Sequence, residues 1–337
     1  MPDTLNQAPS HTDGQAPSQA LSQAPRQTAG QPEGQPEGAA PGQAPDARFA
    51  PIDAESRRTF TEQGYLLIRN ALDEPARTRI EAAVDRVHDA EGRAGRLGPN
   101  GAMHVLGAVF RDEAFGELLD LPTTFPHLWG HLGWNIYVHH SHIDVNPPAL
   151  EPPAPVWAWH QDGYRQNADL DMEPRPMFSI KVAYVLSDLS EEGRGGTLVL
   201  PGSQYSNTLD RTEPGPDGVY PRPPGTVEIT ANPGDAFLFD RRLWHSRSPN
   251  QSTVTRKMVF LCYTYRWIRW RDDVAVDRRG PWWRSLSPLR RQLLGDGDEA
   301  ASHFGFTLES GVWDDGIPLR AELKRRGLLD RSRHYLR

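Results

Sequence analysis

Short apolar runs separated by Gly and Pro residues dominate the middle of this chain of 337 residues. Turn residues recur there at intervals of about ten residues, which is typical of antiparallel sandwiches and barrels and not of alternating strands and helices. The pattern predicts a mainly β fold with a jelly-roll core. Gly234-Asp235 is expected to turn a hairpin between two of the strands. Strands are expected at 135–146, 177–186, 197–203, 226–230, 235–239 and 254–265.

The segments on either side of the strand region differ from it in composition. Residues 1–48 consist largely of Gln, Ala, Pro, Gly and Ser, and such a segment buries too little apolar surface to offset chain entropy, so it is predicted to be disordered. One jelly-roll domain is predicted over 49–270. Residues 271–337 are rich in Arg and Trp and are expected to pack on the same domain, with short helices at 288–294 and 319–329.

Helices are expected to precede the strands and to pack outside one sheet. Asp73, followed by Glu and Pro, is a typical N-cap, and the apolar residues after it recur at helical spacing. They are Ile80, Ala83, Val84 and Val87. A second helical pair is expected within 114–132.

Charge and cysteine content narrow the range of functions. A net charge of -7 argues against a nucleic-acid partner, which needs a basic face, and is a weak indication of a cationic or neutral substrate. The one cysteine, Cys262, is expected to be a buried strand residue, and the lack of any internal disulfide fits a reducing cytoplasm. No apolar run approaches the roughly 18 residues of a membrane span, and no signal pattern opens the chain. A soluble, cytoplasmic protein of open oligomeric state is expected.

A pair of candidate metal ligands lies in the stretch Trp-Ala-Trp-His-Gln-Asp-Gly at 157–163. In an extended segment His160 and Asp162 point to the same face, because strand side chains alternate with a period of two. His245 is the best candidate for a third ligand. Two histidines and one carboxylate form the ligand set of non-haem Fe(II) oxygenases, in which positions stay open for reactants. Arg256, eleven positions beyond His245, could bind the far end of a dicarboxylate whose near end binds the metal.

Polar residues share one face of the strand expected at 135–146, with Val138 before them on that face. Burying them without partners would be costly, so this face either lines a polar cavity or is solvated. A cavity is favoured, because the opposite face is only mildly apolar. The four residues are His140, His142, Asp144 and Asn146.

Two other features bear on such a cavity. Lys181 interrupts a nearly apolar strand, and it either reaches solvent at a sheet edge or points to an anion in the cavity. The polar segment 164–176 is bounded by proline and is expected to form a loop over the mouth of the site.

Taken together, these motifs resemble the phytanoyl-CoA dioxygenase family of Fe(II)/2-oxoglutarate oxygenases. The resemblance covers most of 53–265. Within the family, Tyr-Val-His-His-Ser-His-Ile at 137–143 with Trp-His-Gln-Asp at 159–162 is similar to the ectoine hydroxylase branch. The further motifs are Gly-Tyr-Leu-Leu-Ile at 64–68, Gly-Gly-Thr-Leu-Val-Leu-Pro-Gly-Ser at 195–203, Pro-Gly-Asp at 233–235, and His245 with Arg256.

The resemblance implies a double-stranded β-helix, a cupin-like jelly roll with flanking helices. It implies that His160, Asp162 and His245 bind iron, and that Arg256 binds the distal carboxylate of 2-oxoglutarate. Fe(II) would be the cofactor, with 2-oxoglutarate and O2 as cosubstrates. Because the carboxylate of Asp162 occupies the position that related halogenases leave open for halide, hydroxylation is favoured, with desaturation, ring formation or epimerisation as open alternatives.

The chain departs from the ectoine hydroxylase pattern at four positions. Asn146 stands where those enzymes place a lysine implicated with the cosubstrate, and it is assigned to the cosubstrate site. His140 and His142 stand where they place Gln and Arg near the substrate, and Arg247 replaces a small hydroxyl residue; all three are assigned to substrate binding. These differences disfavour ectoine itself as the substrate.

The expected function is hydroxylation of a C–H bond in a small polar specialised metabolite, with release of succinate and CO2. An aminocyclitol, an aminoglycoside or a modified amino acid, as in antibiotic biosynthesis, fits the polar strand face. Two alternatives come from other classes of protein. One is an O2-independent, metal-dependent cupin isomerase or hydrolase, and the other is a metal-free jelly-roll binding module.

Overall fold

The computed structural model describes residues 46–149, 157–170, 172–216, 218–272, 276–296 and 317–329. They belong to the compact unit Pro45–Arg337. Most of the segment predicted to be disordered lies outside these residues. Its end is folded, because the Asp46 carboxylate accepts a hydrogen bond from the Arg48 backbone N–H and caps a short 3-10 helix, η1 (Ala47–Phe49).

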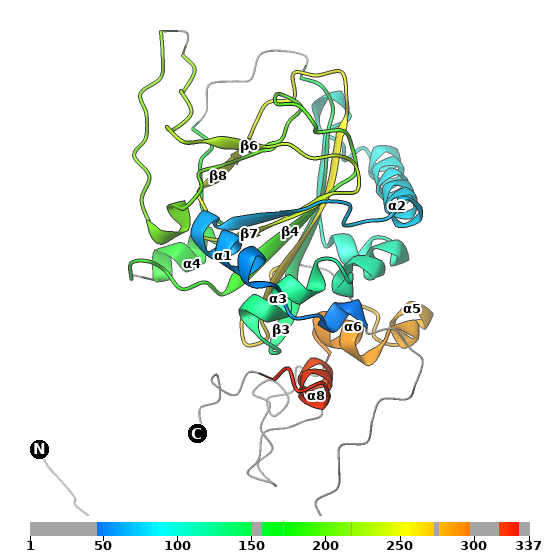
Figure 1. The fold of residues 1–337 in the computed structure, drawn as a ribbon. Helices are drawn as coiled ribbons and strands as arrows, with labels where there is room; N and C mark the ends of the chain where they lie inside the picture. The colour runs from blue at the N-terminus through cyan, green and yellow to red at the C-terminus, as the bar shows by residue number, and fades with distance from the viewer. Residues whose placement is uncertain are drawn as a thin grey trace, which may run out of the picture. The chain divides into compact units, whose positions relative to one another are not determined.

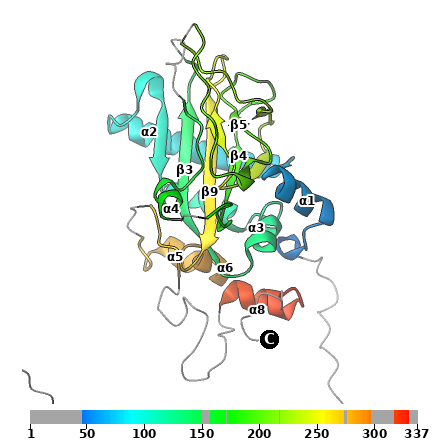
Figure 2. The same ribbon diagram turned by 90° about the vertical axis from the view of Figure 1, so that its left-hand side faces the viewer.

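Six strands form a large sheet in which every neighbouring pair is antiparallel. Its two longest strands, β3 and β9, lie side by side near one edge, with β4 on the other side of β9 (Figure 2). In sheet order the strands are β1 (Tyr65–Ile68), β7 (Ala236–Asp240), β4 (Ser179–Val185), β9 (Arg256–Tyr265), β3 (Ile136–Asn146) and β2 (Met103–Leu106).

A three-stranded sheet lies across from one face of the large sheet (Figure 1). Its order is β6 (Val227–Ile229), β5 (Thr197–Val199) and β8 (His245–Arg247). A separate apolar cluster fills the space between the sheets and joins Val199 and Ile229 of the small sheet to Phe237 and Phe260 of the large one. Two antiparallel sheets facing each other across such a core confirm the predicted jelly roll.

Helices cover the other face of the large sheet (Figure 1). Asp73 caps α2 (Glu74–Arg93) as predicted, and the four residues of its apolar stripe are all buried. None of the helices in the described ranges is both long and apolar enough to cross a membrane. The remaining helices are α1 (Ala54–Gln63), η2 (Pro99–Gly101), η3 (Ala108–Phe110), η4 (Glu113–Asp120), α3 (Phe125–Leu132), α4 (Tyr164–Asp169), η5 (Ser203–Tyr205), α5 (Pro281–Ser285), α6 (Pro288–Leu293) and α8 (Pro318–Arg325).

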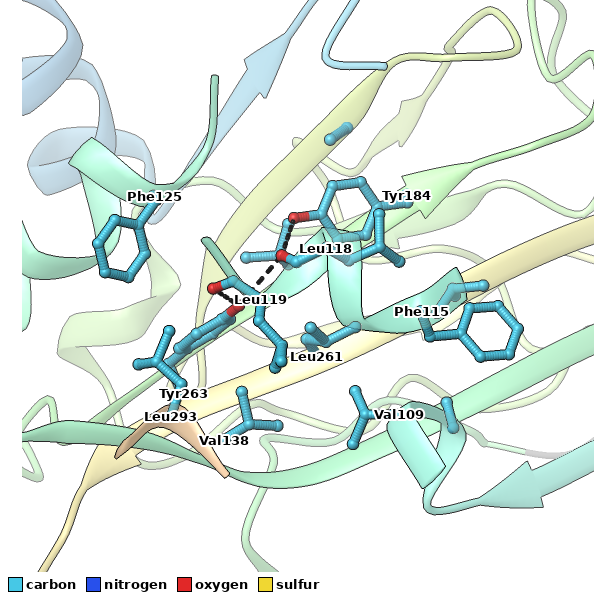
Figure 3. Packing of buried hydrophobic residues seen from close by; sticks show 14 of the residues in the cluster. Val109, Phe115, Leu118, Leu119, Phe125, Val138, Tyr184, Leu261, Tyr263 and Leu293 are labelled. Carbon is cyan, nitrogen blue, oxygen red and sulfur yellow. Dashed lines mark hydrogen bonds between the residues drawn. The ribbon is translucent and has the colours of Figure 1, made fainter. Parts of the chain in front are cut away.

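Two buried tyrosines attach η4 to the large sheet (Figure 3). The Tyr263 hydroxyl donates to the carbonyl oxygen of Leu119 at 2.8 Å, and the Tyr184 hydroxyl donates to the carbonyl oxygen of Leu118 at 3.2 Å. A buried tyrosine hydroxyl requires a polar partner, and 3-10 helices leave carbonyl groups available. These contacts fix the helical layer behind the strands that carry the site.

The predicted hairpin at Gly234-Asp235 is wrong. The strands on either side of this turn belong to different sheets, since β6 pairs with β5 and β7 pairs with β1 and β4. The turn instead carries the chain from one sheet to the other. It is held by Asp235, whose carboxylate accepts hydrogen bonds from the backbone N–H groups of Asn70 and Asn232.

A β-bulge at His139 changes which residues of β3 share a face. The register with β9 shifts between Val138 and His140, so Val138 packs in the helix-side core, while His140, His142 and Asp144 face the small sheet. The expectation that Val138 shares their face is therefore wrong. The prediction of a loop over 164–176 also missed α4, a helix of one and a half turns that shows no buried stripe.

Candidate active site

The three predicted metal ligands come together between the two sheets. His160 and His245 form an isolated antiparallel bridge, with reciprocal backbone N–H to carbonyl hydrogen bonds of 3.0 Å each. Their ring centroids are 4.3 Å apart. One ligand atom from each of His160, Asp162 and His245 lies within 4.8 Å of the others. His245 is the first residue of β8, and a single bridge to it, not a regular strand, orients the His-x-Asp pair.

Each imidazole is held by a backbone carbonyl group two residues earlier. Nδ1 of His160 lies 2.9 Å from the oxygen of Ala158, and Nδ1 of His245 lies 2.8 Å from the oxygen of Leu243. A carbonyl oxygen only accepts, so both Nδ1 atoms must donate, which leaves both Nε2 atoms as lone-pair donors for a metal. Burial lowers the pKa of His245 to about 4, which keeps this ring neutral.

Lys181 forms an ion pair with the third candidate ligand. Its Nζ lies 2.5 Å from Oδ2 of Asp162 and 5.4 Å from the ring centroid of Phe239. Burial raises the pKa of the Asp162 carboxyl, but the nearby Lys181 and His245 outweigh it, so the pKa lies below its ordinary value. Of the two predicted alternatives for Lys181, the structure shows the second, because β4 is an inner strand and the ammonium points to an anion.

A cavity of about 630 Å³ opens at the triad. Arg241 lines one side of it and makes two hydrogen bonds to the backbone of Asp162. The carbonyl oxygen of Arg241 accepts from the backbone N–H of Asp162 at 2.9 Å, and Nη2 of Arg241 donates to the carbonyl oxygen of Asp162 at 2.9 Å. No local sequence pattern identifies this buried arginine. The cavity is lined by His139, His160, Gln161, Asp162, Gly163, Tyr164, Arg165, Gln166, Ser179, Arg241, Cys262, Arg269 and Arg271.

Arg256 lies deep between the sheets at the start of β9, 1% exposed. Its Nη1 donates to Oδ1 of Asn146 at 2.7 Å and lies 3.4 Å from Oδ2 of Asp144. Its Nε is buried without a hydrogen-bond partner among the described residues. An unpaired buried guanidinium N–H is costly, so this end of the site is suited to a further acceptor. Gly195 leaves room there, since a Cβ would lie 3.1 Å from Cδ of Arg256.

The family can now be assigned. The phytanoyl-CoA dioxygenase (PhyH) family model matches residues 60–258, which is more than half of the chain. The chain belongs to the phytanoyl-CoA dioxygenase family. Members of this family are 2-oxoglutarate-dependent dioxygenases that use Fe(II), 2-oxoglutarate and O2, and this dioxygenase is one of them. The O2-independent cupin and the metal-free binding module are thereby set aside.

Relatives of this dioxygenase share about a quarter of their residues with it. The dioxygenase af480 of Aspergillus fumigatus is 24% identical over 262 residues, which cover 74% of this chain and 78% of the relative. The ectoine dioxygenase of Stutzerimonas stutzeri is 26% identical over 248 residues, covering 65% of this chain and 79% of the relative. Among solved structures, apo EctD from S. alaskensis aligns with a TM-score of 0.52 at 19% identity, covering 72% of this chain and 85% of that one. The last likeness shows the fold.

The remaining predicted residues of the dioxygenase lie in two other places. Arg247 and Asn146 line a second cavity of about 500 Å³. His140 and His142 are buried beside each other, with Nε2 of His140 3.1 Å from Nδ1 of His142, and neither lines the cavity at the triad. Nδ1 of His140 lies 2.5 Å from Oδ1 of Asp272, a buried carboxylate that sequence reasoning missed.

A second cluster of possible metal ligands adjoins Arg256. His104, His142 and Asp144 also have ligand atoms within 4.8 Å of one another. Here Asp144 is already paired, since Nδ1 of His104 lies 2.6 Å from its Oδ1 and Arg256 lies beside its Oδ2. A cation bound there would be repelled by the buried guanidinium. The cluster therefore fits a metal less well than the triad does.

Proposed function

We propose that this dioxygenase hydroxylates a C–H bond of a small polar metabolite, with iron bound by His160, Asp162 and His245. The observation that carries the proposal is the orientation of the two imidazoles, whose Nδ1 atoms contact carbonyl groups. One ligand atom from each ring lies within 4.8 Å of an oxygen of Asp162, and Nε2 of His245 lies 3.9 Å from its Oδ1. Two neutral imidazoles and one carboxylate match the preferences of Fe(II). The residues present therefore fit the metal.

Bound Fe(II) and 2-oxoglutarate supply the oxidising chemistry, in which O2 is consumed, 2-oxoglutarate leaves as succinate and CO2, and a substrate C–H becomes C–OH. The protein positions the reactants and excludes water. The cluster between the sheets, with Phe239 and Phe260 nearest the site, provides apolar walls. Lys181 holds one oxygen of Asp162, which favours a single oxygen of this carboxylate facing the metal.

Arg256 is proposed to bind the distal carboxylate of 2-oxoglutarate, with Asn146 beside it. Support comes from the unpartnered Nε of Arg256 and from Asn146, which already orients Nη1 at 2.7 Å. Oδ2 of Asp144 lies 3.4 Å from the same nitrogen, while Oδ1 of Asp144 lies 2.6 Å from Nδ1 of His104. The negative charge of Asp144 is therefore shared between Arg256 and His104. A guanidinium with free N–H groups can accept a carboxylate in addition to these contacts.

The substrate class remains a proposal. A small polar specialised metabolite, such as an aminocyclitol, an aminoglycoside or a modified amino acid, is proposed from the polar face of β3. Direct contact of His140, His142 and Arg247 with that substrate stays a prediction. The carboxylate at position 162 supports hydroxylation over halogenation.

The test is metal content and succinate release in matched variants. His160→Ala should lower both bound iron and 2-oxoglutarate turnover, the latter by at least about a hundredfold, because a ligand is lost. His88→Ala is the control, since this histidine lies on α2 and contacts the carbonyl oxygen of Gly101. Equal iron content and equal turnover in His160→Ala and wild type would refute the proposed site.

A further inference from the structure

We propose that the substrate carries an anionic oxygen group, a carboxylate or a phosphate, which Arg269 and Arg271 bind at the mouth of the cavity. This inference rests on the proposed function, because it concerns the substrate of the same site. It selects among the polar metabolites named above. A modified amino acid or another acid is favoured, and a polycationic aminoglycoside is disfavoured.

The lining of the cavity carries a surplus of positive charge. Among its described lining residues are four arginines but a single carboxylate, Asp162, and that carboxylate is already paired with Lys181. The surplus contrasts with the chain as a whole, whose net charge is -7. A local field opposite in sign to the overall charge attracts anions to the cleft and repels cations.

Two of the four arginines already have partners. Nε of Arg165 pairs with Asp169 at 3.2 Å, and Nη2 of Arg241 donates to the Asp162 carbonyl oxygen and to the Asn167 side chain.

The side chains of Arg269 and Arg271 have no such partners. Both are exposed at the cavity, and no hydrogen bond or ion pair to either guanidinium is found among the described residues. Two exposed arginines that are separated by one residue and line the same cavity offer several N–H donors to an oxyanion.

Backbone contacts hold these arginines in place. The segment after β9 runs back along β3, with the backbone N–H of Arg266 donating to Asn135 O at 3.1 Å and that of Arg271 donating to His139 O at 2.9 Å. The second contact uses the carbonyl group that the bulge at His139 frees from the ladder with β9. The Asp272 carboxylate then accepts from Ser141 N at 2.7 Å. A rigid backbone lowers the entropy lost when a ligand binds.

The charge of Arg271 reaches into the cavity. Burial lowers the pKa of His139 to about 4, and the nearby positive groups, Arg271 among them, act in the same direction. The neutral His139 ring lines the same cavity, with its Nδ1 3.1 Å from Cys262 O. Because Arg271, His139, His160 and Asp162 line the same cavity, an anion bound by Arg271 would lie in the space that opens at the triad.

The first experiment pairs acids with their neutral counterparts. Small amino acids, other carboxylates and sugar phosphates are compared with the matched amides, alcohols and amines as triggers of succinate release by the full chain. The variants are wild type, Arg269→Gln/Arg271→Gln, and Arg58→Gln, an exposed arginine of α1 outside the cavity. We expect acids alone to trigger turnover. The double variant should raise the KM of the acid at least about tenfold, whereas Arg58→Gln should leave this KM unchanged.

The second experiment needs no substrate. Inorganic phosphate is titrated into each variant with excess 2-oxoglutarate present, and tryptophan fluorescence is followed, since Trp267 and Trp270 flank Arg269. A saturable change in wild type and Arg58→Gln that is lost in the double variant is expected.

The outcomes separate this inference from the proposed function. Neutral or cationic triggers that work as well as acids, or a phosphate response unaltered in the double variant, would overturn the anion site. Absence of any 2-oxoglutarate turnover in iron-loaded wild type would instead overturn the proposed function, and the phosphate titration would still decide whether the arginines bind anions.

Discussion

Asp272 is the residue on which the geometry of the cavity mouth depends most, and its replacement gives a sharp test. Its carboxylate is buried and accepts from Nδ1 of His140 at 2.5 Å and from the backbone N–H of Ser141 at 2.7 Å. Burial lowers the pKa of His140, so this ring is neutral and donates from Nδ1. Asp272→Ala leaves two buried donors without an acceptor.

The expected loss of stability follows from those two donors. Each buried donor without a partner costs about 1–3 kcal/mol, so Asp272→Ala should lower the free energy of unfolding by about 2–6 kcal/mol. Asp272→Asn keeps one acceptor oxygen, and the His140 ring can change tautomer to meet the amide, so the loss should be about half as large. Ser141→Ala removes two long contacts of 3.4 Å, one from its hydroxyl to the same carboxylate and one from the Val109 backbone N–H to its hydroxyl, and should cost about 1 kcal/mol.

Urea unfolding followed by both tryptophan fluorescence and far-ultraviolet circular dichroism measures these differences. Asp272→Ala should also weaken acid-triggered turnover, because the segment that carries Arg271 loses its side-chain attachment to β3 and keeps only backbone hydrogen bonds there. A stability within about 1 kcal/mol of wild type, or equal losses for the Ala and Asn variants, would show that the carboxylate does not satisfy these donors.

Two further predictions concern Arg256 and Lys181. Gly195→Ala places a Cβ 3.1 Å from Cδ of Arg256, whereas the Cβ of Gly193→Ala meets nothing within 4 Å. The two glycines have similar positive φ values of 80° and 81°, so both variants should lose about 1–2 kcal/mol of stability. Only Gly195→Ala should raise the KM for 2-oxoglutarate, and equal KM values in the two variants would contradict the assigned role of Arg256. In metal-free protein, the lowered pKa of Asp162 and the raised pKa of Lys181 contribute stability between the ordinary values of 3.8 and 10.5. The free energy of unfolding of Lys181→Met should therefore lie furthest below that of wild type in this pH range, and it should approach the wild-type value as the pH drops below 3.8. A difference in the free energy of unfolding that does not depend on pH would argue against the ion pair.

The His-x-Asp pair of the proposed metal site could be noticed in the sequence because its signal is local and chemical. His160 and Asp162 are two positions apart, and ligand types that recur at such a spacing need no tertiary information to be noticed. The same is true of the strands, whose apolar runs and turn residues identify them, and of α2, whose cap and stripe agree. The His-x-Asp pair was found although the geometry that orients it, a single bridge to His245, was not foreseen.

Other parts of the site depend on contacts between distant segments. Asp272 and Ser141 are far apart in sequence, and no periodicity connects them. The bulge at His139 shifts the register of β3 by one residue, which a period of two cannot show. The direction of Lys181 depended on the order of strands, because an inner strand has no edge at which a lysine can reach solvent. These features arise from tertiary structure and leave no local pattern.

The proposed iron and 2-oxoglutarate site and the proposed substrate-binding arginines lie on different parts of the chain. This separation allows the substrate to differ among enzymes that share the reaction. The triad and Arg256 lie within residues 60–258, the part that matches the family, and they are held by strands and a bridge at the centre of the fold. Arg269 and Arg271 lie beyond that match, on a segment that crosses the cavity mouth. Segments at the rim of a rigid scaffold can change without disturbing its core, so specificity is expected to reside there. Exchanging the residues at 267–271 for another sequence, with the buried Arg266 and Asp272 kept in place, should therefore alter which substrates trigger turnover while the turnover of 2-oxoglutarate without substrate persists.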